Sequence, residues 1–145
     1  MATHSKSPNP ERELVRQHLI ELRAALLNLH KALADSERVF YEQTVGPIQS
    51  PNHFLQLLTR DPWFVWLHPL SQLIVSMDET LDAKVPATHE AMAALVSQSY
   101  LLLAPTETGE GFSKHYFEAL QRDPEVVIAH AEVAKLRRSR KGLPS

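Results

Sequence analysis

Histidine is the residue of this chain that most suggests metal or haem chemistry, because eight histidines occur among 145 residues. A di-iron carboxylate bundle carries Glu-x-x-His on two helices, but no histidine here follows a glutamate by three positions. Pairs of the form His-x-x-x-His or His-x-x-x-Glu are absent too, as is the zinc-protease pattern His-Glu-x-x-His. A metal or haem site would therefore have to combine histidines from distant parts of the sequence.

Four histidines are candidates for such a combined site. His18 and His30 flank the apolar edge of the first expected helix on opposite sides, and roughly 18 Å of helix separates them, so one ion cannot bind both. Each could instead meet a histidine of another helix around a haem iron. The simpler alternative is that these histidines lie at the edge of the core with ordinary hydrogen bonds. The haem or metal hypothesis names His18, His30, His68 and His130 as ligands.

Aromatic residues are concentrated at Trp63, Phe64 and Trp66, and core packing is the plain interpretation of this cluster. Trp66 lies one step off the apolar stripe of its segment, so it is the better candidate for a ligand pocket or a subunit contact. One hypothesis is a site for a small apolar ligand between Trp66, Met77 and the last helical unit. The residues predicted to contact a ligand or partner are Trp63, Trp66, His68, Met77 and His130.

No catalytic constellation is recognisable. The chain has no cysteine and no Gly-x-Ser-x-Gly, and its four glycines form no phosphate-binding loop. A net charge of −2 argues against general nucleic-acid binding. We therefore expect a non-enzymatic, self-associating interaction module, with a haem- or metal-binding helical bundle that has a sensing or redox role as the alternative.

The composition of the chain and the length of its apolar runs also predict where the protein is located. No apolar run is long enough to cross a bilayer, and residues 1–10 are polar without the apolar stretch of a secretory signal. A chain without cysteine suits a reducing compartment, which leads us to expect a cytoplasmic protein. Residues 1–10 and the basic residues 139–145 are expected to be disordered or flexible tails around one helical domain, 11–138.

The first expected helix, 11–44, provides the surface that the other elements must cover. Its apolar residues alternate at spacings of four and three, which places them in one narrow stripe along a helix, and only Ser36 interrupts their apolar character. This stripe is longer than the third expected helix can cover, so we expect a second copy to bury its end near Leu33 to Phe40. The predicted homodimer forms through this helix and the aromatic region. The stripe consists of Val15, Leu19, Leu22, Leu26, Leu29, Leu33, Ser36 and Phe40.

Three further helical units are expected at 51–82, 88–104 and 112–138. Asp61-Pro62 and Asp123-Pro124 break the second and the fourth, since aspartate caps a helix and proline suits its first turn. Pro69 lies within a continuing stripe, so a kink is predicted there rather than a helix end. Short connections favour neighbours in sequence, and the predicted fold is an all-α antiparallel four-helix bundle with a long first helix.

The two Asp-Pro breaks lie within similar segments. Residues 53–68 and 115–130 align at a constant offset of 62 with seven identities in sixteen positions, including a histidine at each end. Duplication of one helix-break-helix unit explains both histidines. Convergence on the same capping residues explains only the Arg-Asp-Pro in the middle. Both explanations stay open.

Overall fold

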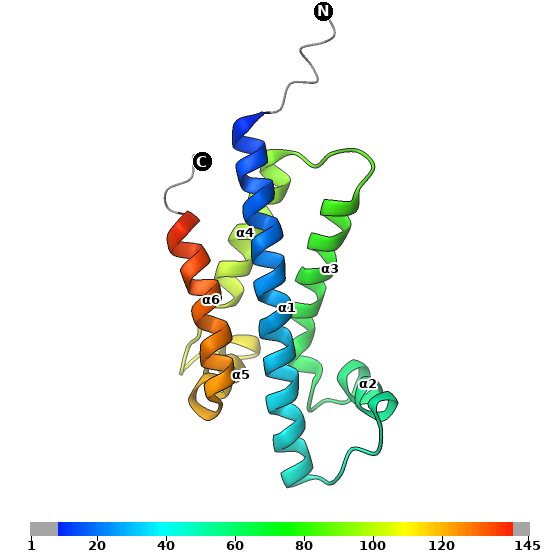
Figure 1. Ribbon diagram of the computed structural model, residues 1–145. Coiled ribbons are helices and arrows are strands. Elements are labelled where there is room, and N and C mark those ends of the chain that lie inside the picture. The colour runs from blue at the N-terminus through cyan, green and yellow to red at the C-terminus, as the bar shows by residue number, and fades with distance from the viewer. Residues whose placement is uncertain (1–8, 141–145) are drawn as a thin grey trace, which may run out of the picture.

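The computed structural model describes residues 9–140, and within that range the chain is all-helical, without a strand (Figure 1). Six α-helices and one 3-10 helix follow each other along the chain. They are α1 (Pro10–Thr44), α2 (Pro51–Arg60), η2 (Val65–Leu67), α3 (His68–Asp82), α4 (His89–Leu102), α5 (Phe112–Arg122) and α6 (Pro124–Arg140). The predicted helical class is confirmed, whereas the predicted number of four helices is not.

Helix α1 is the element that the other helices cover. It packs along α3, α4 and α6, and Figure 1 shows these helices around it. The stripe predicted from the sequence forms this contact, since Leu19, Leu22, Leu26, Leu29 and Leu33 are fully buried. Asn9 starts the helix by accepting hydrogen bonds from the backbone N–H groups of Glu11 and Arg12. The predicted tail 1–10 lies outside the described residues except for Asn9 and Pro10.

The segment predicted as one broken helix, 51–82, is three separate elements. Helix α2 ends at Arg60, and the helix predicted to start at Asp61-Pro62 does not form there: a turn and η2 follow, and α3 begins at His68. The predicted kink at Pro69 is wrong, because Pro69 stands in the first turn of α3. A proline there removes an N–H that has no partner within the helix, so it starts a helix instead of bending one.

The C-terminal unit follows the prediction more closely. Helix α5 ends at Asp123, whose N–H donates to the carbonyl oxygen of Ala119, and α6 begins directly at Pro124. The two similar segments therefore share a helix end at Arg-Asp but differ after it, since a turn follows Pro62 and a helix follows Pro124. Helix α6 includes Ser139 and Arg140, and the rest of the predicted basic tail lies outside the described residues. No helix in residues 9–140 has the length and apolar character needed to span a membrane.

Candidate functional site

An open groove lies between α2 and α3, with α1 at its base, and we call it the histidine groove. Its volume is about 570 Å³, within the range of sites that hold small molecules. Two of the four histidines singled out in the sequence line it, together with apolar and neutral polar side chains. The lining residues are His30, Leu55, Leu58, Thr59, Leu67, His68, Ser71, Gln72, Val75 and Ser76.

The groove exists because two short helices present one face each to the same space. In α2, Ser50 caps the helix through the N–H of His53, and Leu55 and Leu58 then fall on one side. In α3, the lining positions recur at spacings of three and four, which places them on one side of that helix. Helix α2 buries only Leu57 completely, and Figure 1 shows α2 beside the end of α3, away from the centre of the fold. Leu55 and Val75 stay 58% and 52% exposed, so the groove walls keep apolar surface in contact with water.

His30 enters the groove from α1 and is held by a side chain of α3. The Ser71 hydroxyl donates to the carbonyl oxygen of Leu67 at 3.4 Å, so its oxygen accepts from His30 Nε2–H at 2.8 Å. Burial lowers the pKa of His30 below its ordinary value of 6.5, because the charged form loses solvation. His30 is therefore a neutral imidazole at pH 7 with its lone pair on Nδ1.

His68 is fixed in the same tautomer by a different partner. Its Nε2 lies 3.1 Å from the carbonyl oxygen of Leu58, and a carbonyl only accepts, so Nε2 carries the hydrogen. This bond connects the first turn of α3 to the end of α2. The Nδ1 atoms of His30 and His68 have no hydrogen-bond partner among residues 9–140. In its neutral form each ring thus offers one acceptor.

The chemistry of the histidine groove is that of an uncharged, partly apolar surface. Its lining contains four aliphatic side chains and no aspartate, glutamate, lysine or arginine. A charged ligand would lose water there without gaining an ion pair, which costs free energy. A neutral ligand with apolar surface and a hydroxyl or N–H group would cover the aliphatic walls and donate to a histidine.

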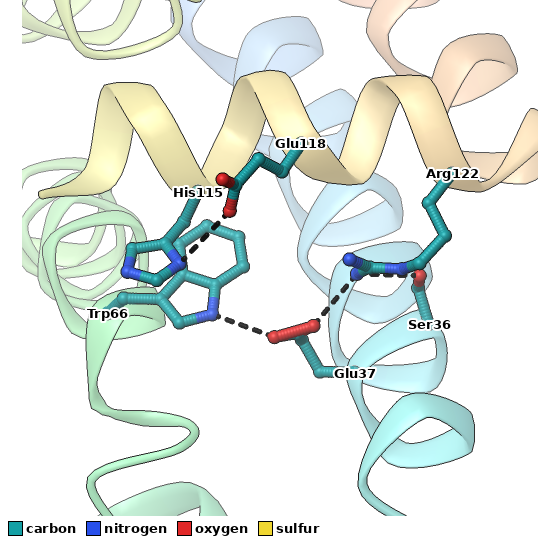
Figure 2. A network of polar contacts seen from close by, with 6 residues as sticks. All are labelled: Ser36, Glu37, Trp66, His115, Glu118 and Arg122. Carbon is teal, nitrogen blue, oxygen red and sulfur yellow. Dashed lines mark hydrogen bonds and ion pairs between the residues drawn. The ribbon is translucent and has the colours of Figure 1, made fainter. Parts of the chain in front are cut away.

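A second polar cluster, the Glu37 cluster, lies where α1, η2 and α5 meet (Figure 2). Glu37 is only 6% exposed, and its two carboxylate oxygens have different partners. One accepts from Trp66 Nε1 at 3.1 Å and the other from Arg122 Nη2 at 2.8 Å. Arg122 also donates to Ser36 and stacks its guanidinium over the Phe40 ring. The buried charge is paired and hydrogen-bonded, as a buried carboxylate must be.

The Glu37 cluster changes the role of Trp66. Its indole is buried, donates to Glu37 and stacks on His115 with a ring separation of 5.1 Å. Met77 is fully buried in the core, and neither residue lines the histidine groove. Sequence reasoning missed Glu37 and Arg122, although Glu37 lies four positions after Leu33 and thus on the buried side of the helix. Arg122, from the last turn of α5, forms an ion pair with Glu37.

The structure does not gather the four predicted metal or haem ligands. His30 and His68 share the histidine groove, whereas His18 Nε2 lies 2.9 Å from the Tyr100 hydroxyl and His130 Nδ1 lies 2.6 Å from the Tyr116 hydroxyl. Burial raises the pKa of Tyr116 and lowers that of His130, so both side chains of this hydrogen-bonded pair are neutral at pH 7. Within residues 9–140, no three histidine, aspartate or glutamate side chains are grouped to hold a metal ion.

Trp63 lies apart from both polar regions. Its indole packs edge-on against the rings of Phe40 and Tyr41 at 5.2 and 5.6 Å. Its Nε1–H is buried without a hydrogen-bond partner in the described part of the chain. Trp63 thus packs against the aromatic residues near the C-terminal end of α1 and does not line the histidine groove. Among the predicted contact residues, only His68 does.

Comparisons with known proteins leave the function to be argued from this geometry. No protein-family model, curated protein or solved structure that was compared with the chain matches it. The histidine groove is an open region in which the two imidazoles keep unused hydrogen-bonding capacity.

Proposed function

We propose that this protein is a non-enzymatic binding module that holds an uncharged, largely apolar small molecule in the histidine groove. The observation that supports the proposal most directly is the combination of four aliphatic side chains with two histidines whose Nε2 atoms are hydrogen-bonded within the protein, and no aspartate, glutamate, lysine or arginine. Such sites recognise ligands by apolar contact and set their orientation by a few polar atoms.

The free energy of binding would come mainly from covering the groove walls. Fully burying an aliphatic side chain stabilises by about 1.5–3 kcal/mol, and Leu55 and Val75 keep about half of their surface available for this. A hydroxyl or N–H group on the ligand would donate to Nδ1 of His30 or His68. A ligand that lacks this donor would gain the apolar contacts alone and bind more weakly.

Haem or metal binding is the second candidate, because the shared groove brings two of the predicted ligands, His30 and His68, to one place. It differs from the first proposal in needing an imidazole nitrogen as a ligand to a metal ion. We also keep a cytoplasmic location as a proposal, which the absence of cysteine supports.

The test uses N-phenyl-1-naphthylamine, an uncharged fluorescent probe with two apolar rings and one N–H donor. Titration of the full-length protein should give a saturable rise in fluorescence. Leu55→Glu places a carboxylate in the groove wall and should weaken probe binding at least about tenfold, since a charge there has no partner. Leu101→Glu is the matched control: Leu101 is also an exposed helical leucine, lies on α4 and should leave binding unchanged.

Three outcomes distinguish the candidates. Saturable probe binding that Leu55→Glu abolishes and Leu101→Glu preserves supports the proposed ligand class. Failure of the probe to bind, or equal loss in both variants with their helical circular dichroism intact, overturns it. Visible absorbance on addition of haem, or zinc binding by calorimetry, that disappears in the His30→Ala/His68→Ala double variant would establish the second candidate instead.

A further inference from the structure

Helix α6 has an unequal distribution of charge along its exposed surface. Its first half follows Asp123 and carries Glu125 and Glu132, whereas its last turns carry the exposed bases Lys135 and Arg138. Arg137 is excluded from this surface, because its guanidinium lies over the Tyr100 ring. A helix dipole favours acids at the start and bases at the end, so the dipole agrees with this division.

The dipole does not explain the apolar side chains between the charges. Ile128 is 58% exposed and Val127 is 45% exposed, and both stand on α6 between Glu125 and Glu132, within its acidic half. Glu125, Ile128, Glu132 and Lys135 recur at spacings of three, four and three, so they form one stripe along the helix. The stripe therefore carries an exposed isoleucine between two acids and continues to a base.

A second groove accompanies the acidic half of this stripe. It lies between α1 and α6 and has a volume of about 390 Å³. Val39, Ile128, Ala32 and Ala129 form its apolar part, with Val39 and Ile128 exposed. Four carboxylates edge it, against one lysine that is already paired with Asp35. The carboxylates belong to Asp35, Asp123, Glu125 and Glu132.

We propose that a second copy of this chain docks on this surface, with the two α6 helices side by side and antiparallel. In that arrangement the basic end of each α6, with Lys135 and Arg138, lies against the acidic groove of the other copy. Two-fold symmetry forms this charge contact twice, and Ile128 of each copy is covered near the centre. A parallel pairing would oppose acid to acid and base to base, which complementarity between interfaces disfavours.

This surface replaces the dimer surface expected from the sequence. The end of the α1 stripe was predicted to need a second copy, but Leu33, Ser36 and Glu37 are buried within the single chain. Helix α5 provides much of that cover through Arg122, whose side chain reaches Ser36 and Glu37. Phe40 alone of the predicted stripe stays exposed at 39%. The unpartnered apolar surface with complementary charge is on α6 instead.

The experiment separates this pairing from other kinds of association by exchanging charges. Sedimentation velocity of the full-length protein at low salt should show a dimer that dissociates as salt is raised, because salt screens the ion pairs. The variant Glu125→Lys/Glu132→Lys makes the stripe wholly basic, and Lys135→Glu/Arg138→Glu makes it wholly acidic. Each variant alone should be a monomer, and an equal mixture of the two should form a heterodimer.

Restored association in the mixture would be difficult to explain by misfolding, because two damaged chains would not regain a specific contact. The matched control reverses two exposed carboxylates on α3, Glu79→Lys/Asp82→Lys, and should leave the dimer intact, because α3 lies on the other side of α1 from α6 (Figure 1). A wild-type protein that stays monomeric at about 100 µM overturns the proposal, as that would imply an affinity too weak for a specific pair. A dimer that both charge variants retain, or a mixture that stays monomeric, overturns it as well.

Discussion

The Glu37 cluster and the histidine groove are both polar regions at the contacts of α1 with later helices, yet their hydrogen-bonding groups are used differently. In the Glu37 cluster, both carboxylate oxygens of Glu37 have partners and the Glu37 side chain is buried. In the histidine groove, each imidazole uses Nε2 within the protein and keeps Nδ1 as an acceptor. Polar groups that are hydrogen-bonded within the protein hold its helices together, whereas an acceptor without a partner in the protein can bind a ligand.

This difference separates stability from binding. The Glu37 cluster joins three elements through a charge that cannot be left unpaired in the interior. The histidine groove contains neutral groups at a partly solvated surface, so losing one of its bonds costs less. Substitutions in the first region should therefore change the free energy of unfolding, and substitutions in the second should mainly change ligand affinity.

The largest expected effect is that of Glu37→Ala. Removing the carboxylate leaves the Arg122 guanidinium and the Trp66 indole N–H without their acceptor, and we expect a loss of about 3 kcal/mol in the free energy of unfolding. Urea denaturation followed by circular dichroism measures it. Glu21→Ala, which removes an exposed carboxylate from the same helix, is the control and should change stability little. A loss below about 1 kcal/mol for Glu37→Ala would mean that the cluster does not hold α5 to α1.

A smaller effect is expected for Ser71→Ala in the histidine groove. The substitution removes the acceptor of His30 Nε2–H, and because His30 is only partly buried we expect about 1 kcal/mol of destabilisation. Ser76→Ala removes a hydroxyl from the same groove wall and serves as the matched control. Both free energies come from urea denaturation. If Ser71→Ala cost as much as Glu37→Ala, the contrast between the two regions would fail.

Acidification should destabilise the protein gradually through His30 and His130. Burial lowers the pKa of both rings in the folded state below 6.5, so the unfolded chain binds more protons as the pH falls through 6.5. The free energy of unfolding should therefore decrease below pH 6.5 and level off once both folded-state rings are protonated. Thermal unfolding between pH 7.5 and 5 measures this decrease. The double variant His30→Gln/His130→Gln should show a weaker dependence, and an unchanged dependence would contradict the assignment.

Patterns that depend on one helix were predictable from the sequence. The spacing of leucines in 15–33 fixed which side of α1 is buried, and Asp123-Pro124 fixed where α5 gives way to α6. Pro69 was misread because the same residue bends a helix in its interior and starts one in its first turn. Whether Pro69 bends a helix or starts one depends on whether the residues before it form an α-helical turn. The conformation of those residues depends in turn on the packing of Phe64 and Trp66 in the core.

The candidate site was harder to predict because it depends on contacts between helices. Nothing near His30 or His68 in the sequence shows that they line one groove, since one lies on α1 and the other starts α3. Glu37 carried a weak local signal, a charged residue one turn after Leu33 on the buried stripe. Its partner Arg122 is 85 positions away, and only the folded chain brings the two together.

The smallest expected effect belongs to Glu118→Ala, at the edge of the Glu37 cluster. Glu118 lies 3.9 Å from His115 Nδ1, and both side chains are about half exposed, so water screens the pair (Figure 2). We expect a change within about 0.5 kcal/mol in the free energy of unfolding by urea denaturation, in contrast to Glu37→Ala. Because Trp66 stacks on His115, the same variant also tests whether the cluster extends beyond its buried carboxylate. If Glu118→Ala lowered the free energy of unfolding nearly as much as Glu37→Ala, the stabilising part of the cluster would include the exposed Glu118 on α5.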